Sequence, residues 1–463
     1  MFHRPVGVSL SCFRKEWPAL LRLAAPVVAA ELGWMGMGIA DTVMVGKISA
    51  EAIGAVAIGN VIFNTIGILV IGFLLGMDTL ISQAVGRQDL ADAAHTFRQG
   101  LWLGAIVAPV LLGIMLLLGV PGIAWWGVDT GVAALAQPYT AVLAWSVLPV
   151  MVYTAARRYL QSTNAVRPVM IALLSANVVN ILGNWVLIEG HWGMPALGVT
   201  GCAYSTILSR IYMAVFLSRS LPAGLWRWVR PERARIGELF RLGLPAAGHI
   251  FLEISGFAAA TALVGWFPPV ALAAHEIALN NAALTYMVPL GISSAAAVRV
   301  GQAVGRGEIH AARVAGWTAI AAGATFMLLS AVTLWAAPVL ILRIYTPEVA
   351  VISFGIPLLY AAAAFQIFDG IQVVTTGALR GIGDTRTPFY ANIVGYWVLS
   401  IPVGALLCFR LGFGVLGLWF GFCLGLFTVA VWLLLCWWRA DIYGDSRESA
   451  VSYAAAVAGK ENP

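Results

Sequence analysis

Charged residues are scarce in this sequence. Only 10% of the 463 residues are Asp, Glu, Lys or Arg, whereas 60% are hydrophobic and the mean hydropathy is +0.88. An ordinary soluble domain has roughly 25% charged residues and about 45–50% apolar ones. The composition therefore excludes a water-soluble globule. Apolar stretches longer than about 18 residues predict a protein that crosses the membrane many times.

The chain also lacks the motifs of several protein classes. Its five cysteines show neither a CxxC spacing nor a Cys/His pattern, so the sequence indicates no disulfide framework and no zinc site. It has no Walker phosphate-binding loop and no Ser/His/Asp arrangement. The net charge of +6 is a signal of membrane topology in such a chain. We therefore expect no enzyme activity, no cofactor and no nucleic-acid partner.

Polar and charged interruptions divide the chain into about twelve hydrophobic spans. These spans lie near residues 20–44, 53–80, 97–119, 133–160, 169–189, 197–219, 239–265, 271–296, 315–341, 351–378, 390–410 and 414–438. Most of the 27 lysines and arginines, with Arg157, Arg158 and Arg380 among them, are assigned to loops on the side of the N-terminus. Cytoplasmic loops retain such cations, so we expect both termini in the cytoplasm of a bacterial cell, with the chain in its cytoplasmic (inner) membrane.

The two halves of the sequence repeat each other. The segment QAVGR at residues 83–87 recurs unchanged at residues 302–306, 219 residues later, and two further matches lie near the same offset. Six spans separate equivalent positions, which predicts parallel repeats. We expect an all-α integral membrane fold of twelve helices, in two six-helix lobes around a central cleft. The expected segments are an N-terminus (1–19), an N-lobe (20–219), a linker (220–238), a C-lobe (239–438) and a tail (439–463).

A few ionisable residues fall inside the predicted spans. A charge near the bilayer centre costs at least about 2.5–3.5 kcal/mol, so such residues are functional candidates. They are Glu31, Asp41, Arg210, His249, Glu253, His275, Glu276 and Asp369.

Glu253 and Asp369 each admit two interpretations. Glu253 lies at mid-span with His249 four residues earlier on the same helical face, and Asp369 has Gln366 and Gln372 three residues to either side. Either group could be a hydrogen-bonded contact that fixes helix packing. Alternatively, each acid takes up a proton, a cation or a substrate. The mid-span depth of Glu253 favours the second interpretation.

Other polar residues divide evenly between structural and functional roles. Asp41 stands close to the outer end of the first span, where solvation lowers its cost. Glu276 and Asn280 share one face of the eighth span, and Asn177, Asn180 and Asn184 form a stripe on the fifth. Such amides are as often interhelical hydrogen-bond donors as ligand contacts. Glu31 has no partner near it in the sequence.

Several segments in a fixed order resemble multidrug and toxic compound extrusion (MATE) transporters, and their combination is similar to the NorM-type branch. They are MGIADTVMVG at residues 37–46, FLE at 251–253, AAHEIALN at 273–280, FDGIQVV at 368–374 and GALRG at 377–381. The resemblance extends from about residue 20 to residue 438, so it concerns nearly the whole chain.

The resemblance implies export of cationic or amphipathic drugs in exchange for entering H⁺ or Na⁺. It places protonation at Asp41, with Asn180 beside it, and cation coupling, including a Na⁺ site, at Glu253 and Asp369. Glu276 and Asn280 complete the candidate binding residues. We expect drugs and membrane lipid as partners, and a monomer.

The sequence departs from the family pattern at two positions. Many relatives carry Gln where this chain has Glu276, and a Tyr is frequent where it has Phe365. The missing phenol removes one oxygen that could coordinate Na⁺, which favours H⁺.

Two other transport classes give different expectations. A flippase for lipid-linked precursors shares the helix count and lobed shape, but it needs several cations in its cavity to hold pyrophosphate, whereas these spans offer acids and Arg210. A passive channel would conduct without coupling and needs no carboxylates at mid-depth. The acids therefore favour a coupled transporter.

Overall fold

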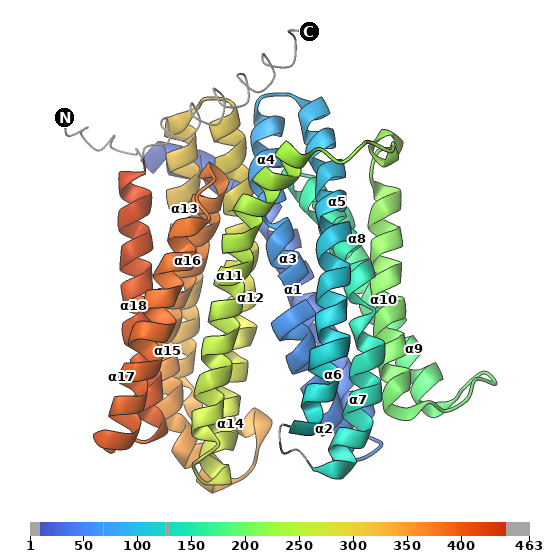
Figure 1. Ribbon diagram of the computed structural model, residues 1–463. Helices are drawn as coiled ribbons and strands as arrows, with labels where there is room; N and C mark the ends of the chain where they lie inside the picture. The colour runs from blue at the N-terminus through green and yellow to red at the C-terminus, as the bar shows by residue number, and fades with distance from the viewer. Residues whose placement is uncertain (1–9, 68, 126, 128, 441–463) are drawn as a thin grey trace.

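The computed structural model describes residues 10–67, 69–125, 127 and 129–440, and the regular secondary structure in these residues is helical (Figure 1). Most of the predicted N-terminal segment and nearly all of the predicted tail lie outside these residues. The helices stand side by side, and both ends of the described chain lie at the same end of the bundle. We call this end the terminal end.

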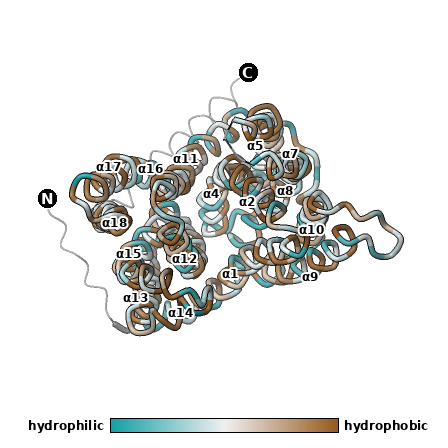
Figure 2. The backbone as a smooth tube through the Cα atoms, turned by 90° about the horizontal axis from the view of Figure 1, so that it is seen from below, coloured by the Kyte–Doolittle hydropathy of each residue, from teal (hydrophilic) through white to brown (hydrophobic). Residues whose placement is uncertain are grey.

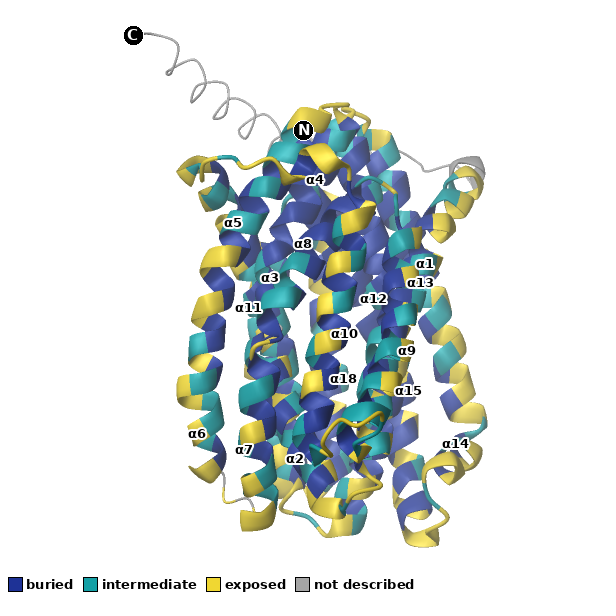
Figure 3. Ribbon diagram, turned by 90° about the vertical axis from the view of Figure 1, so that its right-hand side faces the viewer, coloured by how far each residue is buried: buried dark blue, intermediate teal, exposed yellow. Residues whose placement is uncertain are grey.

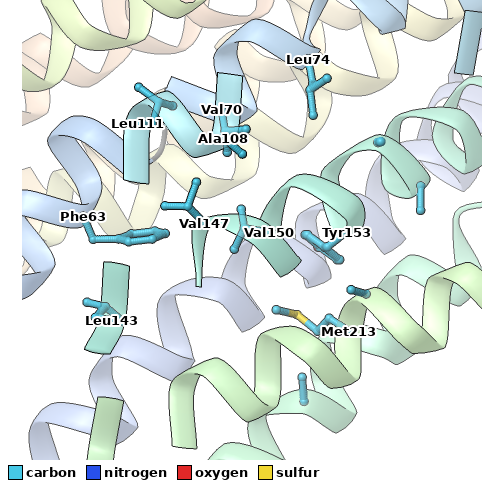
Figure 4. Close-up of a cluster of buried hydrophobic side chains, with 14 of the residues drawn as sticks. Phe63, Val70, Leu74, Ala108, Leu111, Leu143, Val147, Val150, Tyr153 and Met213 are labelled. Carbon is cyan, nitrogen blue, oxygen red and sulfur yellow. The ribbon is translucent and has the colours of Figure 1, made fainter. Parts of the chain in front are cut away.

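The first half of the chain forms the N-lobe. Its helices are α1 (Leu10–Val45), α2 (Ala50–Ile62), η1 (Phe63–Gly67), α3 (Leu69–Leu74), α4 (Gly76–Gly86), α5 (Leu90–Ile114), η2 (Met115–Gly119), α6 (Val120–Gly122), η3 (Ile123–Trp125), α7 (Thr130–Ala144), α8 (Val147–Ser162), α9 (Arg167–Glu189) and α10 (Gly198–Ser220). Phe63, Val147, Val150 and Tyr153 belong to the apolar core that joins these helices (Figure 4).

The second half forms the C-lobe, after a connecting segment that contains η4 (Ala223–Trp226). Its helices are α11 (Arg233–Val264), α12 (Pro269–Gly305), α13 (Ile309–Ala336), α14 (Pro338–Tyr345), α15 (Val349–Ile382), α16 (Arg386–Asn392), η5 (Ile393–Ser400), α17 (Ile401–Ala405), η6 (Leu406–Arg410) and α18 (Val415–Arg439). Figure 2, which looks along the bundle, shows the two lobes as separate groups of helices.

Ten described helical stretches are long and apolar enough to cross a membrane, and α7 with α8, bent by 44°, forms an eleventh. Helix α10 falls on the predicted sixth span and has 23 residues. Its serines, threonines and two arginines lower its hydropathy. With α10, the bundle has the twelve spans expected from the sequence.

The predicted ninth span, 315–341, is wrong at its end. Helix α13 ends at Ala336, and a separate short helix, α14, begins at Pro338. Proline has no backbone N–H to continue the hydrogen bonding of α13, but it suits the first position of a new helix. The apolar run therefore contains a break that hydropathy alone did not reveal.

The lobes are joined at the terminal end. Helices α3 and α4 pack against α11 and α12, and α1 packs against α12. Helix α4 is buried along most of its length (Figure 3). Among the described residues, the hydrogen bonds and ion pairs that connect the lobes lie at this end of the bundle.

Candidate cation and substrate sites

Two buried acids of the C-lobe come from different helices. Glu253 on α11 is 8% exposed and Asp369 on α15 is 3% exposed. Their carboxyl groups are close enough to interact electrostatically. Among the described residues, no Lys or Arg forms an ion pair with either acid. An uncompensated buried charge is costly, so each carboxyl must be neutralised by a proton or a bound cation, or be stabilised by polar neighbours.

The polar neighbours of these acids make only weak contacts. The His249 Nε2 atom lies 3.9 Å from Glu253 Oε2, which is too far for a hydrogen bond. The Gln372 side chain donates to Asp369 Oδ1 at 3.4 Å. Both amide atoms of the fully buried Gln366 lack a hydrogen-bond partner among the described residues. Buried polar atoms are normally paired, so these groups are available to a bound solute.

The N-lobe holds a third buried acid, Asp41, which is 3% exposed. Its Oδ1 atom accepts a hydrogen bond from Asn184 Nδ2 at 2.7 Å, and Oδ2 accepts one from Thr206 Oγ1 at 2.9 Å. The same Asn184 amide donates to Asn180 Oδ1 at 3.3 Å. The structure thus brings together Asp41 and Asn180 through Asn184. Thr206 is a contact that sequence reasoning missed.

A buried cation stands near Asp41. Arg210 lies one helical turn beyond Thr206 on α10, is 6% exposed, and donates a hydrogen bond to Ser146 at the bend between α7 and α8. Its guanidinium carbon lies 3.9 Å from the centre of the Phe63 ring, a cation–π contact. Arg210 is close enough to Asp41 to interact electrostatically. The N-lobe site therefore combines one acid with one fixed base, whereas the C-lobe site contains two acids.

Glu276, Asn280 and His275 lie apart from these two groups. Glu276 is half-buried and Asn280 is exposed, and the Asn280 amide donates to the backbone oxygen of Glu276 at 2.9 Å. His275 is buried and hydrogen-bonds Thr261 and Trp419. Its partners give His275 a role in packing the C-lobe.

Two other buried acids have basic partners. Glu31 forms an ion pair with Arg157, and Asp78 Oδ2 lies 3.2 Å from Arg158 Nη1 and 3.5 Å from Arg380 Nε. The loop positions predicted for these three arginines are wrong, because Arg157 and Arg158 lie within α8 and Arg380 lies within α15, all buried. Their charges are affordable inside the bundle because carboxylates from other helices compensate them.

One sequence signal pointed to these pairs. Asp78 lies inside the predicted second span, and two adjacent arginines close the predicted fourth, so acids and bases were both present at the same depth. Their pairing depends on helix neighbours that hydropathy does not define. Glu31, which has no partner near it in the sequence, is paired by Arg157, 126 positions away.

We expect Glu31 to serve stability. Glu31→Gln leaves the buried Arg157 without its counter-charge and should lower the free energy of unfolding by about 3–5 kcal/mol. The double variant Glu31→Leu/Arg157→Leu removes both charges and should recover most of that loss. Unfolding of the purified protein in detergent measures both. A single variant as stable as the unaltered protein would contradict the assignment.

The comparisons with known sequences cover nearly the whole chain. The profile of the MatE family matches twice, over residues 26–186 and 245–406, and the two matches begin 219 residues apart. A probable multidrug resistance protein NorM of Mesorhizobium japonicum is 35% identical, over 93% of this chain and 95% of its own. The probable NorM of Pseudomonas aeruginosa is 34% identical, over 92% and 90%.

Solved structures share the fold. A crystal structure of a eukaryotic MATE transporter superposes with a TM-score of 0.87 at 22% identity, over 94% of this chain and 98% of that one. An outward-facing multidrug resistance MATE family transporter of the MOP superfamily superposes with a TM-score of 0.85 at 19% identity, over 96% and 100%. Family profile, relatives and fold agree, and the chain therefore belongs to the MATE family, in its NorM-type branch, as a membrane transporter and not an enzyme.

Proposed function

We propose that the protein is a secondary active multidrug antiporter. It exports cationic or amphipathic organic compounds in exchange for H⁺ or Na⁺ that enters the cell, by alternating access of the two lobes. The relatives named as multidrug resistance proteins support this proposal. The observation that carries it is the contrast between acids: Glu31 and Asp78 have arginine partners, whereas Glu253 and Asp369 have none among the described residues.

Unpartnered acids couple the two fluxes through their occupancy. Glu253 and Asp369 bind either the coupling ion or the organic cation. The empty, doubly charged state is too costly to reorient, because two uncompensated charges would cross a low-dielectric region. Exchange is then the only cycle that the lobes complete.

The two lobes have different charge balances. In the N-lobe, Arg210 offsets the charge of Asp41 when this acid is ionised. Asn184 and Thr206 donate to its two oxygens in the present geometry. We propose that Asp41 takes up a proton during the cycle and that Asn180 helps to position it. The C-lobe, with two acids, is the stronger site for a cation.

The surroundings of the C-lobe acids are compatible with either ion. Phe365 packs its ring against Trp419 at 5.7 Å between centroids and offers no oxygen. However, Tyr286 and Tyr396 are close enough to both acids to interact electrostatically. These phenols could replace the oxygen that Phe365 lacks.

The coupling ion is decided by transport into proteoliposomes. We expect efflux of ethidium to follow either an imposed pH gradient alone or an imposed Na⁺ gradient alone. Glu253→Gln should remove the response to whichever gradient is effective. Equal ethidium flux with and without both gradients would contradict antiport and would favour a passive pathway.

The membrane arrangement completes the proposal. We propose that the protein is a monomer in the inner membrane and that both termini are cytoplasmic, so that the end where the lobes join faces the cytoplasm. The flippase alternative is not favoured. Its anionic head group would require several cations, whereas the unpaired buried groups described above are acids, with Arg210 as the exception.

A further inference from the structure

The repeated QAVGR segments meet at the interface between the lobes. Gln83 on α4 donates its side-chain amide to the backbone oxygen of Gly381 at 3.2 Å. Gln302 on α12 donates to the backbone oxygen of Ser162 at 2.8 Å. Gln302 is the repeat counterpart of Gln83, and Gly381 lies at the same offset, 219 residues, from Ser162. The two hydrogen bonds are therefore one contact made twice, once in each direction between the lobes.

Close backbone approaches follow the same symmetry. A Cβ atom on Gly86 would lie 2.2 Å from the backbone oxygen of Gln302, and one on Gly305 would lie 2.1 Å from that of Gln83. Gly305 is again the counterpart of Gly86. These distances leave no room for a side chain, so only glycine lets the two segments touch. The repeat is explained by this mutual contact.

A second pair of glycines extends the symmetric interface. A Cβ atom on Gly72 would lie 2.5 Å from the Cα atom of Ala247, and one on Gly291 would lie 2.9 Å from the Cα atom of Val28. Both residues of the second pair are offset by 219 from those of the first, Gly291 from Gly72 and Ala247 from Val28. Small residues at such positions allow membrane helices to pack backbone to backbone.

One ionic contact breaks the symmetry. Asp78 of the N-lobe is shared by Arg158 of its own lobe and Arg380 of the C-lobe, and Thr79 donates to the backbone oxygen of Arg380 at 2.5 Å. The repeat counterpart of Asp78 is Ala297, so the C-lobe has no equivalent acid. Removing Asp78 would leave two buried arginines facing each other without a counter-charge. This contact is therefore the most charge-dependent part of the interface.

We infer that this symmetric interface is a gate that opens in every transport cycle, and that Asp78 controls how readily it opens. The Gln83 and Gln302 contacts set the register of the closed lobes. The Asp78 carboxylate holds Arg158 and Arg380 together only while the lobes are closed. The inference rests on the proposed function, since alternating access requires this end to open.

The gate is connected to the cation site by one helix. Asp369 and Arg380 both lie on α15, eleven residues apart, which is about three turns and places them on the same face. A shift of α15 when the carboxyls change occupancy would therefore move Arg380 relative to Asp78. The connection gives the C-lobe acids a direct mechanical influence on the gate.

A reversible cross-link tests whether the gate must open. A Cβ atom on Gly301 would lie 2.8 Å from Ser82 Cβ across the interface, and a disulfide needs about 3.5–4.5 Å, so a small shift suffices. We expect Ser82→Cys/Gly301→Cys, with the five native cysteines replaced by alanine, to cross-link on oxidation and to lose ethidium efflux. Reduction should restore it. Undiminished efflux by the cross-linked protein would overturn the gate.

A second measurement does not depend on Gly301. Spin labels at Leu90→Cys and Glu308→Cys, two exposed positions on opposite lobes of the terminal end, report the separation of the lobes. Asp78→Asn should raise the ratio of open to closed populations at least about tenfold. Glu31→Gln is the matched control, because it also leaves a buried arginine of α8 unpaired but acts within the N-lobe alone.

The outcomes separate the gate from the proposed function. Equal distance distributions for Asp78→Asn and Glu31→Gln, in protein folded at the temperature of measurement, would overturn the role of Asp78. Gradient-driven efflux without any opening at this end would overturn the gate and leave antiport intact. Opening at this end in a protein that shows no gradient-driven efflux would leave the gate and reject antiport.

Discussion

Glu253→Gln and Asp369→Asn should each abolish ethidium export by cells while the protein remains in the membrane. Each substitution keeps the size of the side chain and removes its charge, so the neutral amide can no longer exchange a coupling ion for an organic cation. Because both acids are buried and lack a basic partner among the described residues, neutralising them should cost little stability. The rate of ethidium efflux, with the amount of protein in the membrane fraction, measures the effect.

An exposed acid of the same lobe provides the control for this experiment. Glu348 precedes α15 and is exposed, so Glu348→Gln should export ethidium at the unaltered rate. Export at that rate by both Glu253→Gln and Asp369→Asn would reject the assignment of the C-lobe site. Loss of both proteins from the membrane would show that the acids serve folding, which also contradicts the assignment.

Export of a monovalent drug should depend strongly on membrane voltage. If both C-lobe acids must be neutralised, two monovalent ions enter for each drug cation that leaves, and one net charge moves inward. Such a charge gains about 2.3 kcal/mol per 100 mV, which corresponds to roughly a fifty-fold change in the accumulation ratio. Proteoliposomes clamped with a K⁺ diffusion potential at a constant pH gradient measure it.

A divalent organic cation gives the matched comparison for voltage. Two entering charges then balance two leaving charges, so voltage should have little effect on its accumulation ratio. An accumulation ratio for ethidium that does not change with voltage would contradict the two-ion stoichiometry. It would leave one ion exchanged for one drug, driven by the chemical gradient alone.

Hydropathy and repetition predicted most of the fold. The apolar runs are long because each helix must cross the hydrocarbon region, and this length constraint is local in the sequence. The position of α10 was predicted despite Arg210, because the run around this residue keeps its length. The break before α14 was not predicted, since one proline in an apolar run changes the backbone and not the hydropathy.

The candidate sites were only partly predictable. Burial of Glu253, Asp369 and Asp41 follows from their depth within spans, which the sequence shows directly. The partners of an acid depend on which helices are neighbours, and this information is spread over the whole chain. The sequence therefore identified Asp41 but missed Thr206, which lies 165 positions away.

The arginines show the same limit in the opposite direction. A count of cations per loop places Arg157, Arg158 and Arg380 in water, because an unpaired arginine is excluded from the membrane interior. The structure buries them because Glu31 and Asp78 lie within reach on other helices. Charge rules for loops hold for isolated residues and fail where opposite charges meet inside the bundle.

Binding of ethidium to the purified protein tests the central claim most directly. The account requires that drug and coupling ion compete for Glu253 and Asp369. The dissociation constant of ethidium should therefore rise up to about tenfold for each tenfold increase in the coupling ion, H⁺ or Na⁺, per ion displaced. The double variant Glu253→Gln/Asp369→Asn should lose this dependence. A dissociation constant of the unaltered protein that stays the same across pH and Na⁺ concentration would contradict the account.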